Sequence, residues 1–121
     1  MLDVNVDGRE HVSLFDVSHM LQTTVSGRDQ VEFIESLVVA DVAGLADDHG
    51  TLTLFTNDSG GIIDDLIVTR TAHGQLYIVS NAACADNDFR HMSVGSHAVR
   101  LAFSIACGLI QALKRFVTVY R

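Results

Sequence analysis

The residues of this sequence best suited to do chemistry are two adjacent aspartates, Asp64 and Asp65, in the otherwise largely apolar run Ile62–Thr69. Successive side chains of a β-strand point to opposite faces, so a strand here puts one aspartate on each apolar face. A carboxylate on an apolar face must find hydrogen bonds or accept a raised pKa. Such a group could act as an acid or base, or accept a hydrogen bond from a substrate nitrogen. Because two neighbours on opposite faces cannot share one substrate, we expect only one aspartate to be functional.

The same run predicts a central strand that is covered on both sides, because both of its faces are apolar. One face would carry Ile62, Asp64, Leu66 and Val68, and the other Ile63, Asp65 and Ile67. An alternative is that both aspartates belong to a turn and cap the amides of Gly60 and Gly61, with the strand starting only at Leu66. The pattern alone leaves both interpretations open.

The elements around the pair predict an antiparallel meander. Thr51–Thr56 and Ile62–Thr69 flank a Gly60-Gly61 turn that suits a tight reversal, so we expect them to pair as a hairpin. A further turn at Ala72–Gln75 leads to a third strand at Leu76–Ser80.

Three further elements complete the expected layout: a strand at Leu21–Ser26 and helices at Arg28–Val39 and Ala82–Met92. In the second helix Asp86 and Asp88 come early, where negative charge suits the helix dipole. The order predicts an α+β fold, an antiparallel-rich sheet with helices on one face.

The chain has 121 residues, about one domain by size, and its charges are unevenly distributed. Residues 1–88 hold all 15 acidic residues, whereas residues 89–121 hold only basic ones. An acidic body argues against nucleic acid as a partner. The apolar run Leu101–Leu113 is shorter than the roughly 17–25 residues of a membrane span, which favours a core helix over a membrane segment. We therefore expect one domain over residues 1–92 and a basic, apolar, helical tail over residues 93–121.

Metal and targeting signals are not found in the sequence. The two cysteines lie far apart and the histidine spacings fit no zinc site, so we expect reduced thiols and no metal. Neither a phosphate loop nor a dinucleotide fingerprint is present, and the acidic start Met1–Val12 is unlike a signal or transit peptide.

Four blocks together resemble one known family. They are SLFDVSHM (Ser13–Met20), ESLVVADVAGL (Glu35–Leu45), GTLTLFTNDSGGIIDDLIVT (Gly50–Thr69) and LYIVSNA (Leu76–Ala82). Their joint spacing is similar to the aminomethyltransferase, or T-protein, of the glycine cleavage system over residues 13–92, and the wording SHMLQT is closer to its mitochondrial members. After Met92 we expect the resemblance to end.

The resemblance implies a folate enzyme and a mitochondrial location. Members of this family take an aminomethyl group from the lipoyl arm of the H-protein, form methylene-tetrahydrofolate from tetrahydrofolate and release ammonia. By motif matching Asp65 is the catalytic aspartate, beside the amine that attacks the one-carbon unit. Asp64 would then be its structural neighbour, and the folate contacts fall at Met20, Leu52, Val79 and Asn81.

The family's chains are much longer, which implies a fragment of the folate-binding domain with little activity of its own. Two other classes stay open: a non-catalytic folate-binding module of the same superfamily, and a protein-interaction fragment in which Leu101–Leu113 packs on a partner.

Overall fold

The computed structural model describes residues 17, 19–95 and 102–107. Along the chain these residues form eight elements. They are β1 (Leu21–Ser26), α2 (Gln30–Glu35), β2 (His49–Thr56), β3 (Ile62–Arg70), β4 (Leu76–Ser80), the 3₁₀ turn η1 (Ala82–Cys84), α3 (Ala85–Gly95) and β5 (Ala102–Cys107). The acidic start at Met1–Val12 lies outside the described residues.

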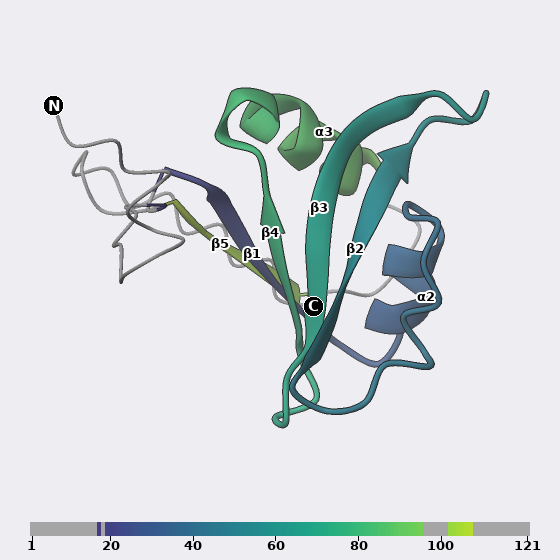
Figure 1. Ribbon diagram of the computed structural model, residues 1–121, viewed down its shortest axis with the longest axis vertical. Helices are drawn as coiled ribbons and strands as arrows, with labels where there is room; N and C mark the ends of the chain where they lie inside the picture. The colour runs from purple at the N-terminus through teal and green to yellow at the C-terminus, as the bar shows by residue number, and fades with distance from the viewer. Residues whose placement is uncertain (1–16, 18, 96–101, 108–121) are drawn as a thin grey trace, which may run out of the picture.

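The five strands form one sheet in the order β2-β3-β4-β1-β5, and each neighbouring pair is antiparallel (Figure 1). The predicted hairpin of β2 with β3 and the meander continuing into β4 are confirmed. β3, which carries both aspartates, is an inner strand between β2 and β4.

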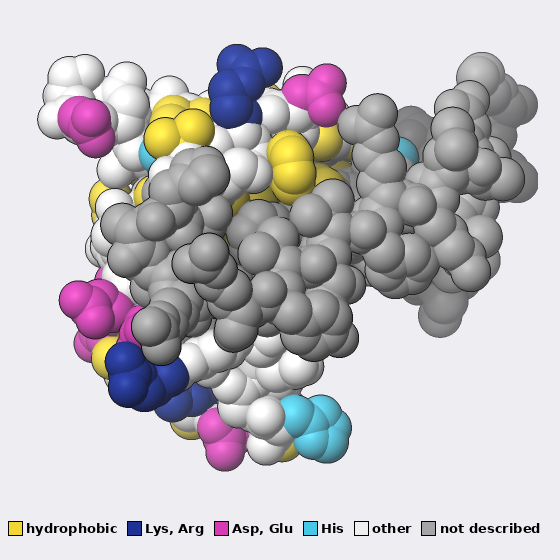
Figure 2. All heavy atoms as spheres, turned by 180° about the vertical axis from the view of Figure 1, so that it is seen from behind, with side chains coloured by type: hydrophobic (Ala, Val, Ile, Leu, Met, Phe, Trp, Pro, Cys, Tyr) yellow, Lys and Arg dark blue, Asp and Glu magenta, His cyan; other side chains and the backbone are white. Residues whose placement is uncertain are grey.

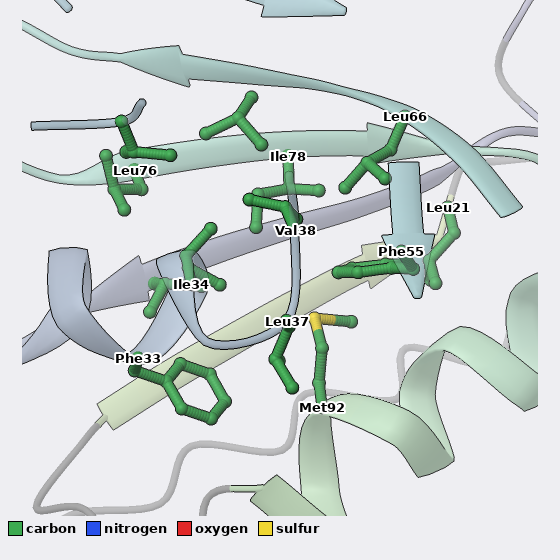
Figure 3. Close-up of a cluster of buried hydrophobic side chains, with 13 residues drawn as sticks. Leu21, Phe33, Ile34, Leu37, Val38, Phe55, Leu66, Leu76, Ile78 and Met92 are labelled. Carbon is green, nitrogen blue, oxygen red and sulfur yellow. The ribbon is translucent and has the colours of Figure 1, made fainter. Parts of the chain in front are cut away.

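The hydrophobic core lies between one face of the sheet and the two helices. Alternate residues of the strands point into it, as Leu76 and Ile78 do along β4, while Phe33 and Ile34 come from α2 and Met92 from α3. Figure 3 shows Met92 directed from α3 toward Leu37 and Phe55, and Ile34 close to Val38 and Ile78. This is the predicted α+β arrangement with helices on one face.

Helix α2 is much shorter than the predicted helix Arg28–Val39. It ends at Glu35 because the next residues leave the helix to lie along β2: Val38 bridges to Phe55, and Thr56 N–H donates to the Leu37 carbonyl at 3.2 Å. Leu37 and Val38 are buried in that position, so burial in the core outweighs the helical periodicity.

The turn before β3 decides between the two interpretations of the aspartates. Its amides are satisfied by Asn57, whose Oδ1 accepts from Ser59 N–H at 3.1 Å and from Gly61 N–H at 2.7 Å. The strand begins at Ile62, so the interpretation of Asp64 and Asp65 as turn caps is wrong.

A register shift then separates Ile62 from the buried row. Phe55 pairs with Asp64, but Thr56 pairs with Ile62, which leaves Ile63 as an extra residue in a β-bulge. The bulge turns Ile62 out to 67% exposure, contrary to the prediction that it shares a buried face with Asp64.

The predicted helical tail is wrong where the structure describes it. Ala102–Cys107 is the strand β5, paired with β1. Short apolar runs do not distinguish helix from strand, and the free edge of β1 offers backbone partners to a strand. The helix before it, α3, runs to Gly95 rather than Met92, and no helix of the described residues is long and apolar enough to span a membrane.

Charged side chains are scattered on the face seen in Figure 2. Basic groups lie near acidic ones at the margins of the coloured region. This distribution is unlike the clustered lysines and arginines that bind phosphate backbones.

Candidate functional site

The face of the sheet opposite the core carries two rows of side chains that run across the strands. Register pairs define the first row: Leu52 with Ile67, Ile67 with Val79, and Val79 with Gln22. At its end, Tyr77 Oη donates to Gln22 Oε1 at 2.8 Å and joins β4 to β1. Leu52 and Val79, predicted to contact folate, therefore stand in one apolar row on either side of Ile67.

The second row lies two residues further along each strand. Leu54 pairs with Asp65, and Asn81 follows the last residue of β4 and donates to Asp65. Of the five site residues predicted from the sequence, Leu52, Asp65 and Val79 lie on one face of the sheet, which we call the open face. Asn81 follows β4 and reaches this face through its hydrogen bond to Asp65, and Met20 immediately precedes β1.

The open face exposes apolar surface. Leu52 is 69% exposed and Ile67 47%, while Val79 is half-buried. The prediction that β3 is covered on both sides is therefore wrong for the described residues, which cover only the core face. Two adjacent rows on a sheet are about 7 Å apart, so the apolar row lies within the span of a fused-ring ligand from Asp65 and Asn81.

Asn81 connects the two aspartates. Its Nδ2 donates to Asp64 Oδ1 at 3.0 Å, to Asp65 Oδ1 at 2.9 Å and to the Asp65 carbonyl at 3.2 Å. Its backbone N–H donates to Asp64 Oδ2 at 3.1 Å. Asn81 can reach both because it lies where β4 ends, in extended conformation before η1 (φ −70°, ψ 134°). One amide thus fixes two carboxylates that point to opposite faces.

The two aspartates differ in burial and in electrostatics. Asp64 is 7% exposed, on the core face, whereas Asp65 is exposed. Burial acts to raise the pKa of Asp64, but the side-chain and backbone hydrogen bonds from Asn81 outweigh it and leave that pKa below its usual value. Asp64 is therefore a buried carboxylate held ionised by Asn81, and Asp65 is the one accessible to a ligand.

A second buried carboxyl lies beneath the pair and was missed as a site residue. Asp88 of α3 is fully buried, and burial raises its pKa to about 6, opposed by the Ser80 hydroxyl and assisted by the Asp64 carboxylate. The signal was present in the sequence: Ala85, Asp88, Phe89 and Met92 follow the helical 3-4 spacing, so Asp88 interrupts an apolar stripe. Asp88 lies in the first turn of α3, as the helix-dipole argument expects, but its side chain is buried.

Cys84 completes the surroundings of this carboxyl cluster. Burial, a hydrogen bond with Asp64 and the charges of three aspartates raise the pKa of its thiol, which keeps it protonated. The thiol is free and has intermediate exposure. The described residues contain no grouping of three or more histidine, cysteine, aspartate or glutamate side chains that could hold a metal ion.

Comparison with known proteins places this arrangement in a family. The family model for the GCVT N-terminal domain matches residues 6–106. The match extends beyond residues 13–92, so the expected end of the resemblance after Met92 is wrong. β5 lies largely within the matched region.

Several mitochondrial aminomethyltransferases are similar in sequence. The one from Gallus gallus is 63% identical over 87 residues, covering 72% of this chain and 22% of the relative. The enzyme from Homo sapiens is 58% identical over 90 residues (74% and 22%), and that from Solanum tuberosum 50% over 92 residues (76% and 23%). The chain therefore spans about a fifth of the length of the curated relatives it matches.

A solved structure agrees with the sequence relatives. The glycine cleavage system aminomethyltransferase T from Bartonella henselae superposes with a TM-score of 0.71 at 32% identity, covering 76% of this chain and 26% of that one. The family model, the sequence relatives and the fold converge, and the chain belongs to the GCVT N-terminal domain family of glycine cleavage aminomethyltransferases.

Proposed function

We propose that this chain supplies the Asp65-bearing part of an aminomethyltransferase of the glycine cleavage system. In this role it serves transfer of a one-carbon unit from the aminomethyl-lipoyl arm of an H-protein to tetrahydrofolate, with release of ammonia. The observation that carries the proposal is the position of Asp65. Its carboxylate accepts from Asn81 at 2.9 Å and stands beside the exposed apolar row of Leu52, Ile67 and Val79.

The open face has the chemistry that a folate requires. A flat pterin buries its ring against apolar side chains and needs few polar contacts for orientation. Leu52 and Val79 would form the apolar wall, and Met20 would extend it beyond Asn81. The folate amine that attacks the one-carbon unit carries an N–H, and an exposed carboxylate next to that wall can accept it.

Asp65 would act by orienting that amine and assisting its deprotonation. Two folate nitrogens form bonds to the one-carbon unit, while its bond to the amino group breaks to give ammonia and its bond to sulfur breaks to give the lipoyl thiol. Each attacking nitrogen loses a proton in this exchange, and a nearby carboxylate can accept it and pass it on to a leaving group. Asn81 would hold the carboxylate in place, since its amide donates to one oxygen and leaves the other free for the ligand.

The remaining parts of the proposal follow the relatives. We propose a lipoylated H-protein as the partner and the mitochondrion, named for the similar aminomethyltransferases, as the location. We also propose that residues 1–92 form part of a folate-binding domain, to whose sheet β5 adds a strand beside β1.

Isothermal titration of the chain with tetrahydrofolate tests the proposal. We expect Leu52→Asp to weaken binding by at least about tenfold, or 1.4 kcal/mol, because it places a charge in the apolar wall. Val39→Asp is the matched control, since Val39 is 65% exposed and lies away from the open face. Equal effects of the two variants, or no binding by the unmodified chain at millimolar tetrahydrofolate, would contradict the proposal.

A non-catalytic folate-binding module is the second candidate, favoured by the exposure of the apolar row, which forms only one wall of a site. Asp65→Asn separates the two. If the chain is an enzyme, it should release ammonia from aminomethyl-loaded H-protein in the presence of tetrahydrofolate. The rate of release should then fall at least about a hundredfold in Asp65→Asn, the lower end of the range for loss of a general base. Folate binding without ammonia release by the unmodified chain would favour the module.

A further inference from the structure

The starting observation is a carboxyl group with no donor. Asp88 is 0% exposed, and neither of its oxygens accepts a hydrogen bond of ordinary geometry from the described residues. It lies one helical turn before Met92, on the face of α3 that packs against the sheet. A buried carboxylate in this position would be strongly disfavoured, whereas a carboxylic acid needs only one acceptor for its O–H.

The groups that face Asp88 supply that acceptor. From the sheet these are the Asp64 carboxyl of β3 and the Ser80 hydroxyl of β4, both of which interact with it. From η1 the Cys84 thiol interacts with it electrostatically. On α3 itself His91 packs its ring edge-on against Phe55, with ring centroids 5.4 Å apart.

The two carboxyl groups differ in which of them should hold a proton. Both Asp64 oxygens accept hydrogen bonds from Asn81, so Asp64 is stabilised as a carboxylate. Asp88 accepts no hydrogen bond of ordinary geometry from the described residues and is the more buried of the two. Two neighbouring carboxyl groups favour a shared proton, and burial without donors of ordinary geometry favours that proton on Asp88, from where its O–H can donate to the Asp64 carboxylate.

We propose that Asp88 is a positioning residue for Asp65, acting through Asp64 and Asn81. The neutral acid fixes the Asp64 carboxylate, Asp64 fixes the backbone and side chain of Asn81, and Asn81 holds the Asp65 carboxylate on the open face. A helix behind the sheet thereby sets the orientation of a group on the other side. The effect of Asp88 on folate binding rests on the proposed function. The series of contacts from Asp88 to Asp65 is independent of that function.

The first test follows the Asn81 side-chain amide by ¹⁵N NMR in the 121-residue chain as a function of pH. In the unmodified protein we expect its shift, and that of the Asp88 carboxyl carbon, to change together with a midpoint at about 6. Asp88→Asn keeps a donor and cannot ionise, so Asn81 should stay at its low-pH shift up to pH 8. The matched control Asp86→Asn, an exposed residue of the same helix, should titrate like the unmodified chain.

The second test is Asp88→Leu, which removes the donor. We expect the Asn81 amide to move away from both end points and tetrahydrofolate affinity to fall by about tenfold, with affinity retained in Asp88→Asn. Should Asp88→Leu fail to fold, Asp88→Asn still decides. An Asn81 amide that titrates in Asp88→Asn as in the unmodified chain overturns the inference. Absence of folate binding by the unmodified chain overturns the proposed function instead, and the NMR result stands separately.

Discussion

Asn81 Nδ2 lies 2.9 Å from Asp65 Oδ1, and this contact joins the end of one strand to the middle of its neighbour, 16 residues earlier in the chain. The same nitrogen donates to Asp64 Oδ1 at 3.0 Å. Asn81 therefore does more than contact a ligand, the only role that the family resemblance implied for it. It also sets where both carboxylates of β3 point.

Replacing Asn81 by alanine should destabilise the chain as well as weaken folate binding. Hydrogen bonds to charged groups contribute about 1.5–3 kcal/mol each, and the variant loses the side-chain bonds to both aspartates. We expect the free energy of unfolding in urea to fall by roughly 2–3 kcal/mol, less than the sum of two such bonds because Asp65 is exposed to solvent. Asn87→Ala, an exposed position on α3, is the control and should change it by less than about 0.5 kcal/mol.

Replacing Asp64 by alanine should mainly lower stability, whereas replacing Asp65 by alanine should mainly abolish folate binding. Asp64→Ala leaves the half-buried Asn81 backbone N–H without its acceptor, which costs about 1–3 kcal/mol of stability. Asp65→Ala removes an exposed group and should cost less than about 1 kcal/mol, while tetrahydrofolate binding is lost. Thermal unfolding and calorimetric titration of both variants measure the contrast. Equal stabilities would mean that Asp64 has no structural role.

Most of the sheet was predictable because its signals are local. The Gly60-Gly61 turn, the alternation in Leu76–Ser80 and the apolar run of β3 each specify an element without reference to distant residues. Motif matching then singled out five residues, and the register brings three of them, Leu52, Asp65 and Val79, to one face. Their roles as catalytic and binding residues stay predictions.

What the sequence did not reveal depends on contacts between distant segments. The end of α2 at Glu35 follows from burial of Leu37 and Val38 against β2, and the bulge at Ile63 from the pairing of Phe55 with Asp64. Similarly, β5 is a strand because β1 offers a free edge. Local periodicity carries none of this information.

Stability should decrease as the pH rises from about 4 to about 7. Asp88 has a folded-state pKa raised to about 6, so the folded chain binds more protons than the unfolded chain in this range. The stabilisation is complete below the ordinary pKa of aspartate and is lost as the pH passes through the raised value. Asp64, whose pKa is lowered, acts in the opposite direction and loses its contribution only at more acidic pH.

Urea unfolding at intervals between pH 4 and pH 8 would measure this dependence. Asp88→Asn removes the raised pKa and should flatten the curve above pH 4, so that the variant gains stability relative to the unmodified chain as the pH rises. Asp86→Asn should leave the curve unchanged. If the free energy of unfolding depended on pH equally in all three proteins, the pKa of Asp88 would not be raised in the folded chain.

The turn that leads into β3 should be sensitive to the residue at position 60. Gly60 has φ 79°, a left-handed conformation that costs residues with a Cβ about 1–2 kcal/mol, although a Cβ added there would meet no atom within 4 Å. We expect Gly60→Ala to lower the free energy of unfolding by about 1 kcal/mol. Gly60→Asn should lower it less, since asparagine tolerates this region. Both variants add a Cβ in open space, so the difference between their free energies of unfolding reports the backbone conformation at position 60. Equal losses of stability would argue against the left-handed turn that leads into β3 and its two aspartates.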